Sequence, residues 1–426
     1  MLIMRLLCAF AWAFVALPAC AQTSATASPL TLWAVLDSVS SQHPLVEAAA
    51  ARVRAARGAR ATAGAFGNPM LTYQVENAPL PGRPAPPMDR ETMLTATLPL
   101  EPLYQRWSRV GGGNAGVRAA EADAVGERQR VGLNAAHAFY RTALAQVGLE
   151  AARDLADWLD TVVAYNQARV GEGVTAEADL IRSQLERDRA AAEATMQEAD
   201  LARARADLST FIGVEAAPSS LLVAIADDAP LPLPATVAED RAMDTRPDIR
   251  AARERLAAAG AGVTFERTGL IRQLGVTLGT KRSAGTTSLI AGVSLPFPLF
   301  DQNRGAIGRA AAERDAAAFE LAAQERAGRA ELVGASEAAR VLTARAGVMA
   351  DRSRGETYLT RADEARRIAL GAYREGAIPL IQVIDAARAW GEARIAYYRI
   401  LYAQHESVLA LLAAEGVDIR RAEARP

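Results

Sequence analysis

The sequence contains two copies of one unit, and this duplication constrains the fold more than any other feature. Residues 44–52 (PLVEAAAAR) match residues 247–255 (PDIRAARER), and Glu-Gly occurs at 172–173 and again at 375–376. Both pairs are separated by 203 residues, and between them TLPL in the first copy corresponds to SLPF in the second. Ordered matches at one spacing indicate an internal repeat.

The repeat predicts the domain organisation. We expect a first repeat over residues 22–215 and a second over 237–415, followed by a tail at 416–426. Residues 216–236 form the predicted linker, because prolines gather there, at Pro218, Pro230, Pro232 and Pro234.

The N-terminus predicts an export signal over residues 1–21. Arg5 precedes an apolar run that Pro18 ends, and Ala19-Cys20-Ala21 fits the small-residue cleavage pattern. The alternative is a lipoprotein signal, with Cys20 retained and acylated. The only other cysteine, Cys8, lies within the same signal, so the mature chain has no pair for a disulfide.

Each copy predicts the same series of elements. A first helix is expected at 31–65 and again at 237–268. Two segments of alternating apolar and polar residues, at 71–76 and 94–98 and again at 274–278 and 289–295, predict strands. A very long helix follows at 105–169 and at 303–374. A glycine-bearing turn then leads to another helix at 176–211 and at 380–414.

The strand count predicts an assembly. Four strands cannot close a barrel, and an open sheet edge is not tolerated in hydrocarbon, whereas three chains would supply twelve strands. The predicted fold is mainly α with a small β part. If the strands lie in a membrane, three chains would form a trimeric α-barrel of long antiparallel helices and a 12-stranded β-barrel of a size allowed for the outer membrane.

Several other classes of protein are disfavoured. The 48 basic and 49 acidic residues nearly cancel, so nucleic acid is not an expected partner. Residues 111–116 (GGGNAG) fit the dinucleotide pattern G-x-G-x-x-G, but the helix after them is too long for a βαβ unit, and a flexible or kinked helix start is the preferred interpretation. The histidines His43, His137 and His405 are scattered. We expect no enzyme, no cofactor and no bound metal.

Two motifs carry a resemblance to a known family. Gly67-Asn68-Pro69 leads into the first strand, and residues 294–305 (SLPFPLFDQNRG) lead from the last strand into a long helix. The mature chain resembles the TolC-like outer-membrane efflux family, and the second motif is most similar to its cobalt–zinc–cadmium branch. The resemblance implies a homotrimer in outer-membrane lipid with its helical barrel in the periplasm. It also implies two partners, a periplasmic adaptor protein and an inner-membrane, proton-driven transporter of the RND type.

The resemblance also implies roles for two turns. The glycine turns match the tips where adaptors dock, with the docking residues Val170, Gly173, Val174, Gly376 and Ala377. Gly also suits the φ > 0 conformation at a helix C-terminus, so plain helix caps are the alternative.

A pore gate is implied next to these tips, formed by Asp179, Tyr373, Gln382 and Asp385. Gln382 is neutral where the family has an acid, and Ile378 stands where the family has an arginine. A locked gate of the usual kind is therefore not expected, and Asp385 could instead be a solvated acid on a helix face.

The favoured function is an outer-membrane channel of a tripartite efflux system, exporting divalent heavy-metal cations. A multidrug or type I protein-secretion duct has the same fold. A periplasmic coiled-coil structural protein is the alternative from another class.

Overall fold

The computed structural model describes residues 29–79, 81–82, 84, 87–213, 221–224, 229–235, 238–269, 274–295, 297–351, 353 and 356–420. The predicted signal and Cys20 lie outside these residues.

The chain contains two successive series of elements in nearly the same order, the second with one helix more than the first. The first comprises α1 (Leu32–Gln42), α2 (Pro44–Gly64), β1 (Met70–Glu76), β2 (Glu91–Pro99), α3 (Glu101–Gly171) and α4 (Glu177–Ile212). The second comprises α5 (Glu239–Thr245), α6 (Pro247–Thr268), β3 (Gly275–Ser283), β4 (Thr286–Ser294), α7 (Arg304–Ala350), α8 (Tyr358–Arg374) and α9 (Leu380–Ala414). All four predicted strands are confirmed, and β3 extends five residues further than predicted.

The prediction of a single first helix in each repeat was wrong. The chain breaks between α1 and α2 at His43 and between α5 and α6 at Arg246, and both residues are extended, with ψ of 129° and 126°. Pro44 and Pro247 follow them, and a proline pushes the preceding residue out of the helical region. The breaks fall at equivalent positions, so the duplication is visible in the backbone.

The predicted long helix over 303–374 is also interrupted. Helix α7 ends at Ala350, and Asp351 turns the chain by accepting a hydrogen bond from the backbone N–H of Ser353 (2.8 Å). Helix α8 then starts with Thr357 as its N-cap, whose hydroxyl accepts from the N–H of Thr360 (3.2 Å). The equivalent helix of the first repeat, α3, is continuous over 71 residues, roughly 100 Å.

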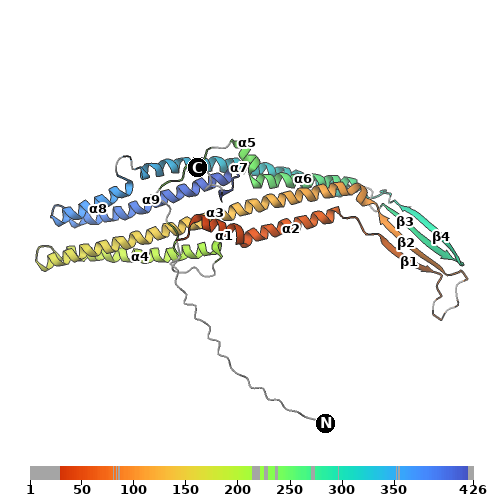
Figure 1. The fold of residues 1–426 in the computed structure, drawn as a ribbon, viewed down its shortest axis with the longest axis horizontal. Coiled ribbons are helices and arrows are strands. Elements are labelled where there is room, and N and C mark those ends of the chain that lie inside the picture. Colours follow the sequence, from red (N-terminus) through yellow and green to blue (C-terminus); the bar gives the residue numbers. More distant parts are fainter. Residues whose placement is uncertain are drawn as a thin grey trace, which may run out of the picture.

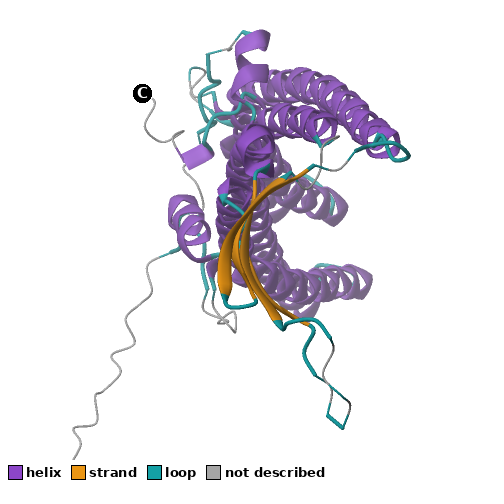
Figure 2. Ribbon diagram, turned by 90° about the vertical axis from the view of Figure 1, so that its right-hand side faces the viewer, coloured by secondary structure: helices purple, strands orange, loops and turns teal. Residues whose placement is uncertain are grey.

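The elements form an elongated molecule with two distinct ends. The four strands lie at one end, and the turns of the α3–α4 and α8–α9 hairpins lie together at the other (Figure 1). Viewed along the long axis, the helices form a curved wall (Figure 2). In the part of the chain that the structure describes, no helix has a stretch apolar enough to cross a bilayer.

The glycine-rich segment at 111–116 lies inside the continuous helix α3 and serves packing. A Cβ on Gly113 would lie 3.1 Å from the Cα of Arg60 on α2, and one on Gly112 would lie 3.4 Å from the Cβ of Ala261 on α6. These glycines therefore let two neighbouring helices approach α3 closely, and the dinucleotide interpretation is not needed.

The largest apolar core lies midway along the molecule, where α1, α3, α4 and α9 meet around Val35, Phe139, Leu208 and Leu401. Two buried glutamines fix the segment between the repeats to it. Gln146 bonds to both backbone groups of Val223 (2.8 and 3.2 Å), and Gln404 bonds likewise to Leu231 (3.0 and 2.8 Å).

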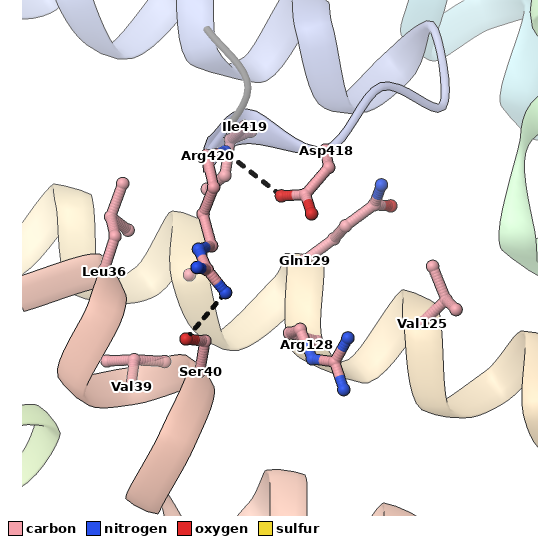
Figure 3. Close-up of a pocket in the computed structure, with 10 residues that line it drawn as sticks. Leu36, Val39, Ser40, Val125, Arg128, Gln129, Asp418, Ile419 and Arg420 are labelled. Atoms are coloured by element: carbon pink, nitrogen blue, oxygen red, sulfur yellow. Dashed lines mark hydrogen bonds between the residues drawn. The ribbon is translucent and has the colours of Figure 1, made fainter. Parts of the chain in front are cut away.

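The C-terminal end of the described chain closes a small cavity of about 40 Å³ against α1 and α3 (Figure 3). Arg420 donates to the Ser40 hydroxyl (2.9 Å), and Ile419 lies so close to Gly132 that a Cβ there would be 2.9 Å from its Cδ1. A space of this size holds little more than one water molecule, so it is a packing feature.

The close approach at Gly113 can be tested against a neighbouring glycine. We expect Gly113→Leu to push α2 away from α3 and to cost about 1–3 kcal/mol of stability. Gly111→Leu is the matched control, since open space surrounds Gly111 and leucine favours a helix. Thermal unfolding followed by circular dichroism measures both, and an equal effect of the two substitutions would contradict the packing role.

Candidate functional site

The two hairpin turns have the same backbone geometry. Gly173 and Gly376 both adopt positive φ, +71° and +76°. In the first turn the N–H of Gly173 donates to the carbonyl of Val170 (3.0 Å) and that of Val174 to Arg169 (2.9 Å). The second turn repeats both bonds through Gly376 and Ala377 (3.0 and 2.8 Å). This is the Schellman helix ending, and it explains why glycine occurs at both turns.

The tips present small residues to solvent beside charged ones, since Glu172, Arg374 and Glu375 are also exposed. Gly173, Val174, Gly376 and Ala377 are exposed, while Val170 is half-buried. A partner that approaches this end of the molecule would therefore meet a surface without long side chains at the two glycines.

Tyr373 joins the two hairpins just above the tips. Its side chain is buried, and its hydroxyl donates to Oδ1 of Asn166 on α3 (2.6 Å). Its ring packs edge-on against Tyr165, and the Arg169 guanidinium lies over both rings. Burial raises the pKa of the Tyr373 phenol, and the nearby charge of Asp179 raises this pKa further.

Sequence reasoning missed Asn166. It is a single polar residue in a long helix, and nothing in its local pattern marks it. The side chain of Asn166 is fully buried. Its hydrogen-bond partner, the hydroxyl of Tyr373, reaches it only because α8 packs against α3.

The other gate residues lie on helix starts next to the tips. Asp179 is half-buried in the first turn of α4. Gln382 and Asp385 are both exposed and lie one turn apart on α9, opposite the buried Val383 and Ile384. The structure thus brings Tyr373 near Asp179 and leaves Gln382 and Asp385 facing solvent together.

Ile378 takes part in packing instead of an ion pair. It is half-buried against an apolar cluster that includes Val162, Tyr373 and Val383. The position that the family resemblance assigns to an arginine is therefore used here to hold α9 against α3.

At the opposite end, the sheet has two chemically different faces. The strands pair antiparallel in the order β1-β2-β3-β4, and directly paired residues share a face. One face is mainly apolar and largely exposed; its members are Leu71, Tyr73, Val75, Leu94, Ala96, Leu98, Val276, Leu278, Leu289, Ala291 and Val293.

The other face is mainly polar and internally bonded. The hydroxyls of Thr97 and Thr277 share a hydrogen bond (2.9 Å), Lys281 pairs with Glu91, and Ser283 donates to the same Glu91 carboxylate (2.8 Å). This division predicts a sheet with lipid or protein on one side and water on the other.

Among the residues that the structure describes, no group of three or more His, Cys, Asp and Glu side chains is suited to hold a metal ion. His137 contacts Glu406 (3.1 Å), and the buried His405 contacts the carbonyl of Ala229 (3.2 Å). Burial lowers the pKa of His405, as expected for an imidazole used in packing.

The chain thus forms a long helical wall with a two-faced sheet at one end. Comparisons with known proteins show which proteins it resembles. Residues 239–417 match the family of outer membrane efflux proteins. The chain is similar to the cobalt-zinc-cadmium resistance protein CzcC of Cupriavidus metallidurans, with 27% identity over 88% of this chain and 87% of that protein. It is 33% identical to the nickel and cobalt resistance protein CnrC of the same organism over 65% of each chain.

Solved structures share the fold. The outer membrane protein VceC of Vibrio cholerae superposes with a TM-score of 0.74 at 18% identity over 91% of this chain and 96% of that one. CusC superposes with a TM-score of 0.73, also at 18% identity, over 91% and 92% of the two chains. Residues 239–417 therefore form an outer membrane efflux protein domain, the chain has the fold of these solved channels, and the predicted fold class, without its assembly, is confirmed.

The two faces of the sheet predict opposite effects of one substitution. We expect Leu278→Arg, in the middle of the apolar face, to cost about 2–4 kcal/mol in the bilayer and to lower the amount of protein in the outer membrane. Thr277→Arg, one residue away on the polar face, is the control and should insert well. Immunoblots of outer-membrane fractions measure both, and the reverse order would show that the faces are assigned backwards.

Proposed function

We propose that this chain is the outer-membrane duct of a tripartite efflux system that exports divalent heavy-metal cations. The observation that carries the proposal is the similarity to CzcC along nearly the whole chain, since CzcC is named for resistance to cobalt, zinc and cadmium. CnrC, named for nickel and cobalt, supports the same class of cargo. The family assignment argues against a periplasmic structural coiled coil.

The duct is formed by three copies. The two edge strands of the sheet, β1 and β4, each have one neighbour in the chain. Pairing β4 of one copy with β1 of the next would satisfy both edges, and three copies give twelve strands in a closed ring. The apolar face of this ring contacts lipid, and the polar face lines the passage.

The tips receive the periplasmic adaptor, which connects the duct to an inner-membrane RND-type transporter. Two turns with identical bonding and exposed small residues offer two similar docking points per chain. Val170, Gly173, Val174, Gly376 and Ala377 form this surface. The close backbone approach that glycine allows is the physical reason for its place there.

The gate consists of Asp179, Tyr373, Gln382 and Asp385, close to the tips. The buried bond from Tyr373 to Asn166 holds α8 to α3 within one chain. Three exposed copies of Asp385 around an axis would concentrate cations at the pore mouth. A duct for metal cations benefits from this field, whereas a duct for proteins does not need it.

The docking role of the tips can be tested together with the cargo. We expect Gly376→Val to abolish export, because valine resists φ near +76° and strains the turn by about 1–3 kcal/mol. Gly371→Val, inside α8 with open space around it, is the matched control. The readout is cellular zinc, cobalt and cadmium in cells that depend on this duct, measured by elemental mass spectrometry.

The comparison of export is valid only if both variants reach the outer membrane in the same amount as the unchanged protein. Full metal export by the Gly376→Val variant would refute the docking role. Restored drug or protein export without any metal export by the unchanged chain would refute the cargo and favour the multidrug or secretion duct.

The acidic ring is tested by conductance. In planar bilayers we expect Asp385→Ala to lower the preference for cations and to weaken block by divalent cations, because it removes an exposed carboxylate from each chain. Gln382→Asp should raise both, since it adds an acid one turn away. Unchanged selectivity in both variants would mean that Asp385 is a solvated acid on the helix face.

A further inference from the structure

Two carboxylates are paired at the end of the sheet that lies away from the helices (Figure 1). Glu76, the last residue of β1, is directly opposite Glu91, the first residue of β2. Residues paired in this way on antiparallel strands share a face, with their Cβ atoms about 5 Å apart. Like charges at this distance destabilise a sheet, so the two acids need a compensating charge.

Lys281 of β3 supplies this charge. Its ammonium forms an ion pair with Glu91, and the Ser283 hydroxyl donates to the same carboxylate (2.8 Å). Glu76 also attracts the ammonium electrostatically, and its own carboxylate accepts from Nε2 of Gln74 (2.8 Å). One cation therefore serves two acids, and all of these side chains lie on the polar face of the sheet.

The residue type at this position is unique in the chain. Lys281 is the only lysine, and all other residues counted among the 48 basic ones are arginine. A lysine ammonium is a compact, hydrated point charge, whereas an arginine guanidinium is a planar fork. Of the two, the ammonium resembles a metal cation more closely. Lys281 thus places a tethered cation beside the acid pair.

Without the ammonium, the same two acids would suit a divalent ion. Carboxylate oxygens bind zinc directly, and neighbouring carboxylates bind harder divalent cations as well. The Lys281 and Glu91 side chains are 33% and 21% exposed, so the pair can be reached from the water-filled side of the sheet. An exported ion that passes along the polar face would meet Glu76 and Glu91 at the end of its route.

We propose that Lys281 is a specificity-determining residue at the exit of the duct. Its ammonium occupies Glu76 and Glu91 as a tethered cation, so that divalent metal ions leave without being retained there. A metal ion could bind the acids only by displacing a charge that cannot diffuse away. This inference rests on the proposed export of divalent cations along the polar face, and the test below separates the two.

The test removes the ammonium from the folded, assembled protein. In planar bilayers that contain the full protein, sulfo-N-hydroxysuccinimide acetate converts the Lys281 amine into a neutral amide, and the N-terminus holds the only other amine. Zn²⁺ or Cd²⁺ is then added on the side that the sheet faces, away from Asp385. The readout is the concentration that halves the channel current. We expect acylation to lower it roughly tenfold, because a repelling charge a few ångströms from the carboxylates is lost.

Three variants serve as controls. Lys281→Arg keeps the charge, and its guanidinium does not react with the reagent, so treatment should leave its block unchanged. Arg282→Gln removes a cation one residue away on the opposite face of β3, so this variant should be blocked like the unchanged protein without treatment. Glu91→Gln leaves a single acid, so acylation of this variant should not strengthen the block.

Each result decides one point. If acylation strengthens the block equally in Lys281→Arg or in Glu91→Gln, the effect arises elsewhere and the role of Lys281 is refuted. The same holds if Arg282→Gln alone reproduces the effect. If the protein conducts cations but acylation leaves the block unchanged, the role of Lys281 is refuted and the duct stands. If the protein forms no conducting channel, the duct and this inference are both refuted.

Discussion

The close approach of neighbouring helices to α3 determines the whole architecture. Helices α1, α2, α4, α6 and α9 all pack against it, and the chain achieves this with few aromatic residues, 5% of the total. Glycine and alanine at the contacts allow short distances between helix axes, so the wall stays thin over roughly 100 Å. Because α3 is continuous from the sheet to the tip, it fixes the distance between the sheet and the hairpin tips.

Most of the fold could be predicted from local sequence patterns. The features that were missed are breaks within helices, and these too have local causes. Alternation predicted all four strands, since neighbours on a strand face opposite sides. The breaks before Pro44 and Pro247 were missed, although each proline signals one, because the helical pattern continues across it. The interruption after Ala350 was missed for another reason: Asp351 and Thr357 cap helix ends only when the chain turns there, and both residue types also occur within helices.

The residues of the candidate site also fall into those that could be predicted from the sequence and those that could not. Gly173 and Gly376 could be predicted, because a tight reversal between two helices commonly uses a residue with φ > 0, a conformation that glycine adopts without strain. The partner of Tyr373 could not, because Asn166 lies 207 residues away and meets it only when α8 packs on α3. The use of Ile378 in packing was hidden for the same reason. The role of a residue can be predicted from the sequence when it depends on local backbone conformation. It cannot be predicted in this way when it depends on which helices pack together.

The distribution of charge suits a conduit that must release what it carries. Many acids of the helical body are paired with arginine, as Asp154 is with Arg394 and Asp160 with Arg187. On the polar face of the sheet, Glu91 is paired with Lys281. Asp385 has no such partner among the residues that the structure describes. A cation would thus meet many paired charges along the wall, and Asp385 is an exposed carboxylate near the tips that no described arginine or lysine neutralises. Pairing of the acids weakens their hold on a passing cation, and weak binding keeps transit fast.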